Sequence, residues 1–215
     1  DNSRYYRAIP YGTSRSEPFT DLQTFRKYII NEVLLQAWSS GRMWKRPDLL
    51  LIPRRFLQRI GGNDAWTPDL QHWDNERCLP YVRQAAAAVE VETSLWQVAK
   101  ATVSLSFTIK HEDLEKLRAW VNANGIPLYI LQVFYDEAHV LPFSKLELLI
   151  QEGKAIAKVD QTTKKATYKI PLEEGIRLGR IPEPDVEGRV FKAPNGRVTV
   201  YGRLVGSHIE VEDPN

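Results

Sequence analysis

The sequence predicts an α/β fold in which a central mixed sheet is flanked by helices and followed by a C-terminal β-hairpin extension. Three observations predict it. Short apolar runs such as RPDLLLIP at residues 46–53 and IPLYILQVFYD at 126–136 are typical of buried strands. A long amphipathic segment precedes the second run, as in folds whose sheet is covered by helices. After residue 150 the chain changes to two strand–turn–strand units rich in Lys and Arg.

The composition is that of a globular protein. The chain has 215 residues, of which 43% are hydrophobic and 26% charged, and this is enough to bury one sizeable core. No apolar run approaches the roughly 20 residues that span a bilayer, and the first residues do not resemble a signal peptide. The single cysteine, Cys78, has no metal-ligand spacing around it and suits a reducing compartment. We therefore expect a soluble cytoplasmic protein without a zinc site.

The first expected element is a helix over residues 20–41. Thr20 and Gln23 match a capping box, and apolar residues follow at mainly helical spacing. Residues 46–53 then predict a buried strand, because the apolar run is short and bounded by prolines. The polar segment 61–80 predicts a loop or a short-helix excursion.

The segment AAAAVEVETS, residues 85–94, predicts a second strand. Its four alanines favour a helix. The valines that flank Glu90 and Glu92 and the short length favour a strand that another element covers closely. We therefore assign it to the sheet.

The next elements continue the α/β pattern. Residues 110–125 predict the best helix in the chain, since acids lie near its start and a glycine ends it. Residues 126–136 predict a strand, and AHVLPF at 138–143 predicts a strand that pairs with it. Residues 154–170 and 188–204 each predict a hairpin, with turn signals in the middle of each.

The acids at Glu90 and Glu92 point to a site. Alternate side chains of a strand share a face, so both carboxylates project together, where like charges repel. Asp48 lies at the start of the preceding strand. A hard divalent cation such as Mg²⁺ prefers carboxylate oxygens. The sequence therefore predicts a magnesium site at Asp48, Glu90 and Glu92.

The motifs RPDLLLI, AVEVETS and SFTIKHEDLEKLRAWVNANGIPLYILQVFYD lie between residues 20 and 143. On these motifs the chain resembles the PD-(D/E)xK nuclease superfamily, and within it a type II restriction endonuclease. The resemblance implies that Asp48 and Glu90 bind one or two Mg²⁺ ions per active site. It also implies that a lysine two residues after the second acid helps to activate the attacking water. Here Glu92 stands where that lysine is usual, as in some members of the superfamily.

The identity of the general base stays open at the level of the sequence. Glu92 can itself accept the proton of the water or contact a second metal ion. Alternatively, a basic group arrives from elsewhere, with Lys100 as the nearest candidate and Lys110 as the next. Glu32, on the helix before the aspartate strand, is an accessory candidate, with a surface position as the alternative interpretation. A rival Pro-Asp pair at Asp69 is rejected because its surroundings are polar and turn-like.

The resemblance implies a Mg²⁺-dependent, site-specific endodeoxyribonuclease that hydrolyses phosphodiester bonds in double-stranded DNA. A homodimer is expected because a two-fold protein matches a palindromic site, and a companion DNA methyltransferase is expected from the resemblance. The alternatives are a Holliday-junction resolvase or repair nuclease of the same fold, or a catalytically inactive DNA-binding protein. Residues 1–150 would form the catalytic core and residues 151–215 a β-rich extension, within one compact domain.

Two basic regions are candidate DNA contacts. Between residues 39 and 60 basic side chains alternate with aromatic ones, and arginines lie near the turns of the C-terminal hairpins, where they could read guanine or contact phosphates. The candidates are Arg42, Lys45, Arg46, Arg54, Arg55, Arg189, Asn195 and Arg197. The alternative interpretation is a solvated surface for the first region, and a dimer contact or a cap on the sheet for the second.

Overall fold

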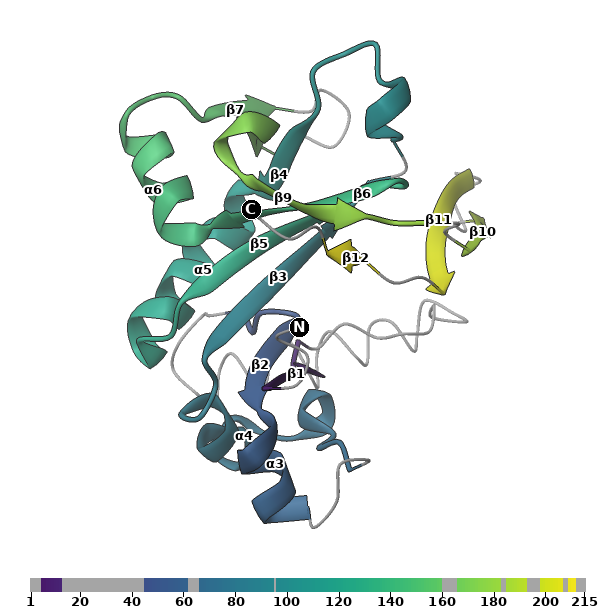
Figure 1. The fold of residues 1–215 in the computed structure, drawn as a ribbon. Coiled ribbons are helices and arrows are strands. Elements are labelled where there is room, and N and C mark those ends of the chain that lie inside the picture. The colour runs from purple at the N-terminus through teal and green to yellow at the C-terminus, as the bar shows by residue number, and fades with distance from the viewer. Residues whose placement is uncertain are drawn as a thin grey trace.

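The computed structural model describes residues 5–12, 45–61, 66–94, 96–159, 166–182, 185–192, 198–206 and 209–211, with side chains described up to residue 182 and at 209–210. Within these ranges the protein is an α/β structure, with a mixed seven-stranded sheet in the order β1-β2-β3-β5-β6-β9-β12 and four α-helices (Figure 1). The α/β class with a mixed central sheet is therefore confirmed. The helix expected over residues 20–41 lies outside the described residues.

All neighbouring strands of this sheet are antiparallel except β3 and β5. Its first three strands are β1 (Tyr6–Pro10), β2 (Leu49–Pro53) and β3 (Ala87–Thr93). The strands predicted at residues 46–53 and 85–94 are thus confirmed. Ala87 and Ala88 are buried in β3, so their small side chains allow close packing over the strand. This packing outweighs the helical propensity of the alanine run.

A helical crossover leads to the next pair of strands. α5 (His111–Asn124) ends at Gly125, which adopts the left-handed conformation with φ of 66°, as helix C-caps often do. The chain then enters β5 (Leu128–Val133), which is parallel to β3, and β6 (Glu137–Pro142), which is antiparallel to β5. The helix and both strands match the elements predicted for residues 110–143.

Several elements were not predicted. Among them are β1, α3 (Arg54–Gly61), η4 (Val98–Lys100), β4 (Ser106–Lys110), α6 (Phe143–Gln151) and η5 (Leu172–Glu174). η3 (Leu70–His72) and α4 (Asn75–Val82) occupy the segment for which short helices were expected. α3 and α6 each begin directly after a strand that ends in proline. No loop residues separate strand from helix at these two points, which hides the change from one to the other.

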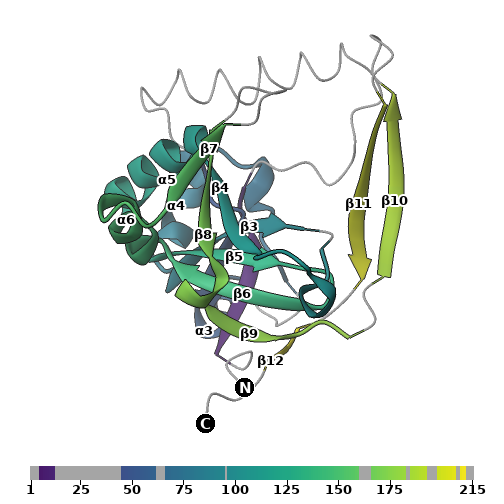
Figure 2. The same cartoon turned by 90° about the horizontal axis from the view of Figure 1, so that it is seen from above.

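The C-terminal part forms the two predicted hairpins. β7 (Ile156–Val159) pairs with β8 (Ala166–Pro171), and β10 (Asp185–Lys192) pairs with β11 (Val198–Gly206). β8 also pairs with β4, giving a second sheet of three strands. The β10–β11 hairpin stands apart from the central sheet in both views (Figures 1 and 2).

The remaining strands tie the chain after residue 150 to the central sheet. β9 (Ile176–Arg180) pairs with β6, and β12 (Glu210–Val211) pairs with β9. Strands on both sides of residue 150 therefore share the same sheets.

The core lies between the central sheet and the helices α5 and α6, which lie beside each other (Figure 2). Leu114, Leu117 and Trp120 of α5 are buried together with Phe143, Leu146 and Leu149 of α6. Arg118 joins the two helices through an ion pair with Glu147 at 2.6 Å. Among the described helices, none is long and apolar enough to cross a membrane.

Candidate active site

The pairing of β2 with β3 brings Asp48 beside Glu90. Leu49 pairs with Val89 in an antiparallel register, so the residue before β2 lies level with the residue after Val89. The Val91 amide donates a hydrogen bond to Oδ2 of Asp48 at 2.8 Å. The aspartate predicted from RPDLLLIP is thus held against the strand that carries the predicted glutamates.

The backbone of Asp48 is fixed from the other side by the segment that follows β1. The amides of Tyr11 and Gly12 donate to the Asp48 carbonyl at 2.8 and 3.1 Å. A Cβ atom at Gly12 would lie 3.0 Å from the Asp48 Cα and 3.1 Å from its Oδ1. The close approach of these two segments therefore favours glycine at this position. Asp48 is held on both sides by main-chain groups.

Glu90 is the most buried acid of the site. It is 1% exposed, its Oε1 forms an ion pair with Lys45, and its Oε2 is buried without a hydrogen-bond partner among the described residues. Burial and then the Asp48 charge raise the pKa of Glu90 to about 7, against the attraction of Lys45. A buried carboxylate oxygen without a partner is costly, and it marks this point as a place for a cation or a proton.

Lys45 was expected among the DNA contacts, but the structure places it at the acids. Its Nζ contacts Glu90 and lies 3.6 Å from Oδ2 of Asp113. Burial lowers the pKa of Lys45, but the charge and hydrogen bond of Glu90, together with the charges of Asp113 and Asp48, outweigh it, so the pKa is raised overall. Asp113 lies in the first turn of α5, where acids are common because of the helix dipole. Because an acid at a helix start is common, the sequence gives no sign that Asp113 belongs to the site.

Glu92 lies further along β3, level with Gln132 of β5. Gln132 is buried. Its Nε2 donates to the Glu92 carbonyl at 3.2 Å, and its Oε1 accepts from the Thr108 amide at 3.1 Å. Burial raises the pKa of Glu92, and the charges of Lys110 and then Lys45 oppose the increase. Gln132 was not predicted as a site residue, although a single amide in an apolar strand is a signal that could have indicated it.

The two candidate lysines lie in different places. Lys110 ends β4 and directly precedes α5, and it is the first charge that stabilises ionised Glu92. Lys100 lies exposed in η4. The amides of Val98 and Ala99 in this turn donate to Asp136 at 2.8 and 3.0 Å. Within the described residues Lys100 has no interaction with the acids of the site, so the structure brings Lys110 rather than Lys100 to Glu92.

Arg46 is a structural residue rather than a surface contact, which corrects the expectation that it meets DNA. Its side chain is buried and lies over the Tyr11 ring at 5.0 Å. It donates to Oδ1 of Asn75 at 2.6 and 2.9 Å and to the carbonyls of Leu70 and Trp73 at 3.1 and 2.8 Å. These hydrogen bonds anchor the segment that contains η3 and the start of α4.

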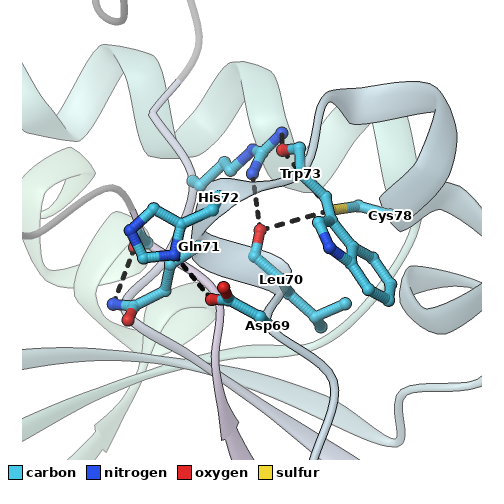
Figure 3. Close-up of polar contacts among 8 residues, drawn as sticks. Asp69, Leu70, Gln71, His72, Trp73 and Cys78 are labelled. Atoms are coloured by element: carbon cyan, nitrogen blue, oxygen red, sulfur yellow. Dashed lines mark hydrogen bonds and ion pairs between the residues drawn. The ribbon is translucent and has the colours of Figure 1, made fainter.

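The rival Asp69 lies in an exposed turn and pairs with Nδ1 of His72 at 2.6 Å (Figure 3). Arg55 is exposed and Arg54 half-buried at the start of α3. The predicted Glu32, Arg42, Asn195 and Arg197 lie outside the described residues, and Arg189 lies in β10 with its side chain outside them.

The donor set at Asp48 and Glu90 fits a hard divalent cation. Mg²⁺ usually takes one or two carboxylates and completes its shell with waters. A cation here would give the buried Oε2 of Glu90 a partner and relieve the repulsion between the two acids. In the described part of the chain, no group of three or more His, Cys, Asp or Glu side chains is arranged to hold an ion. The three acids expected as ligands therefore do not form a ready three-ligand set.

Comparison with protein-family models finds no match, and neither does comparison with curated proteins. Among solved structures, a nuclease from a fusselovirus is similar to the chain with a TM-score of 0.36 and 13% sequence identity, over 75% of this chain and 90% of the nuclease. A TM-score this low does not define a common fold. The proposals below therefore rest on the residues of the site.

Proposed function

We propose that the chain is a Mg²⁺-dependent nuclease that hydrolyses phosphodiester bonds in double-stranded DNA, of the type II restriction class and with the PD-(D/E)xK core. The observation that supports it is the pair of Asp48 and Glu90 on adjacent strands, with one oxygen of Glu90 buried and without a partner among the described residues. A purely structural acid would have this oxygen satisfied. In an acid that binds a cation, this oxygen would lack a partner until the cation binds.

Asp48 and Glu90 would hold one or two Mg²⁺ ions, which lower the pKa of a water and stabilise the leaving oxygen. Asp48 is fixed for this role because its carboxylate and its carbonyl both accept main-chain hydrogen bonds. Burial raises the pKa of Glu92, which makes it a better proton acceptor than an ordinary surface glutamate. Lys110, whose charge favours ionised Glu92, would hold that acid in its basic form.

Site selection is proposed to involve the basic surfaces outside the sheet. Arg55 is exposed at the start of α3, and the β10–β11 hairpin extends away from the sheet (Figure 2). A protruding hairpin with Arg189 on one strand is suited to enter a groove of the duplex. A homodimer would present two such hairpins to a palindromic site, and a companion methyltransferase would protect the host DNA.

The test is a plasmid-cleavage assay with Mg²⁺ on the purified chain. Asp48→Ala and Glu90→Ala should each abolish cleavage, whereas DNA affinity should persist because phosphate contacts are retained. Asp69→Ala is the matched control, since this aspartate also follows a proline but lies in an exposed turn. It should cleave like the wild type. Wild-type cleavage by either site variant would refute the proposal.

The same assay separates the alternatives. Discrete fragments from plasmid DNA indicate a restriction enzyme, whereas cleavage confined to four-way junctions indicates a resolvase. If the wild-type chain binds DNA but does not cleave it with Mg²⁺ or Mn²⁺, the chain is a DNA-binding protein without nuclease activity. In that case the acids serve as structural ion pairs.

A further inference from the structure

Lys45 occupies the centre of the acidic site. Its ammonium group contacts Glu90 and lies 3.6 Å from Asp113, and Asp48 is close enough to stabilise its charge. Carboxylates from β3 and α5 thus contact one ammonium group, and the carboxylate just before β2 lies near it. The side chain of Lys45 is 32% exposed, against 1% for Glu90 and 14% for Asp113. Lys45 is therefore more accessible to solvent than either acid.

We infer that Lys45 is a built-in cation that neutralises Glu90 in the metal-free protein and moves away from it when the metal binds. This inference rests on the proposed function, because it presupposes that Asp48 and Glu90 bind a divalent ion. A divalent ion that binds Oε2 of Glu90 would lie close to the ammonium group that contacts Oε1 of the same carboxylate. Two cations this close in a buried site repel each other, so the metal and the lysine compete. Once released, the lysine is free to approach a bound phosphate.

The two charges should compete measurably. In the metal-free protein Lys45 relieves the repulsion among the acids, so its loss should destabilise this state. The same loss removes the competitor and the positive charge that opposes the metal, so it should increase metal affinity. If Lys45 instead assisted metal binding from a neighbouring position, its removal would lower the metal affinity or leave it unchanged.

The experiment uses Lys45→Met in the full chain, with Ca²⁺ as a probe that binds to such sites without requiring cleavage. Calorimetric titration without DNA should give a Ca²⁺ affinity about tenfold or more above the wild type. The metal-free variant should melt at a lower temperature than the wild type, and Ca²⁺ should raise its Tm by more.

Two matched variants serve as controls. Lys110→Met removes a charge that acts on Glu92 but forms no ion pair within the described residues, so it should change Ca²⁺ affinity by less than about threefold. Lys154→Met removes an exposed lysine that pairs with Glu152 and should change neither affinity nor Tm.

The outcomes distinguish this inference from the proposed function. If the wild type does not bind Ca²⁺, Mg²⁺ or Mn²⁺, the proposed function itself fails. If the wild type binds Ca²⁺ and Lys45→Met binds it equally or more weakly, the metal site stands but Lys45 does not compete for it. An affinity increase of the same size in Lys110→Met would also overturn the inference, because the effect would then reflect net charge alone.

Discussion

Replacing Glu90 by Gln should make the metal-free protein more stable at high pH. The pKa of Glu90 is about 7 in the folded protein, against 4.5 for an ordinary glutamate. The folded state therefore binds this proton more tightly than the unfolded chain. The contribution of the neutral carboxyl to stability is complete below about pH 4.5 and is lost as the pH rises through 7.

The size of the loss follows from the difference between the two pKa values. A pKa of about 7 against 4.5 corresponds to about 3 kcal/mol of unfolding free energy. This value already includes the attraction of Lys45, which opposes the increase in pKa. Glutamine keeps the shape of the side chain and carries no charge at any pH. Glu90→Gln should therefore not lose this unfolding free energy as the pH rises.

The assay is urea unfolding at pH values from 4.5 to 8.5 with a chelator present. The unfolding free energy of Glu90→Gln minus that of the wild type should increase by up to about 3 kcal/mol over this range. The control is Glu152→Gln, which replaces an exposed acid that pairs with Lys154, and its difference should stay nearly constant. A Glu90→Gln difference that is independent of pH, or that falls as the pH rises, would refute this account of Glu90.

Three further predictions concern the site and the DNA surface. In a single-turnover assay, Lys110→Ala should lower the cleavage rate by on the order of 10²-fold and Lys100→Ala by much less. This order is the reverse of the one expected from the sequence. Equal small effects would show that neither lysine assists Glu92. Gly12→Ala should slow cleavage by about tenfold and lower the Tm, because the new Cβ would lie 3.0 Å from the Cα of Asp48. A wild-type rate would show that this close approach does not position Asp48. Alanine at Arg189 and Arg197 should lower the slope of log affinity against log salt by about one unit for each phosphate contact that is lost. If the slope and the site preference both stay unchanged, the surface that reads DNA lies elsewhere.

The main strands and the central helix could be predicted because their sequence signals are local. RPDLLLIP and AAAAVEVETS each contain a complete strand with its boundaries, and α5 has acids at its start and a glycine at its end. α6 was missed because it begins directly after β6, with no polar break between them. β1 was missed because a five-residue strand in a polar segment gives little periodicity to detect.

The candidate site was predictable only in part, because proximity in a sheet depends on pairing. Asp48 and Glu90 were recognisable by motif, and the register of β2 and β3 brings them together. The placement of Lys45 and Asp113 depends on how α5 and the segment before β2 meet over the sheet, which no spacing in the sequence reveals. Lys100 was favoured because it is near Glu92 in sequence, yet the chain between them carries it into an exposed turn.

The arrangement of the site depends on a single register. Leu49 pairs with Val89, and a slip of one residue would place Asp48 beside a valine and turn its side chain to the opposite face. The hydrogen bond from the Val91 amide to the Asp48 carboxylate then could not form. Leu50 is fully buried on β2, and such a slip would expose it, so the core opposes the same shift that would disperse the acids. Packing of the sheet and placement of the carboxylates are therefore determined together, which explains how a strand otherwise suited to burial can carry a charged residue at Glu90.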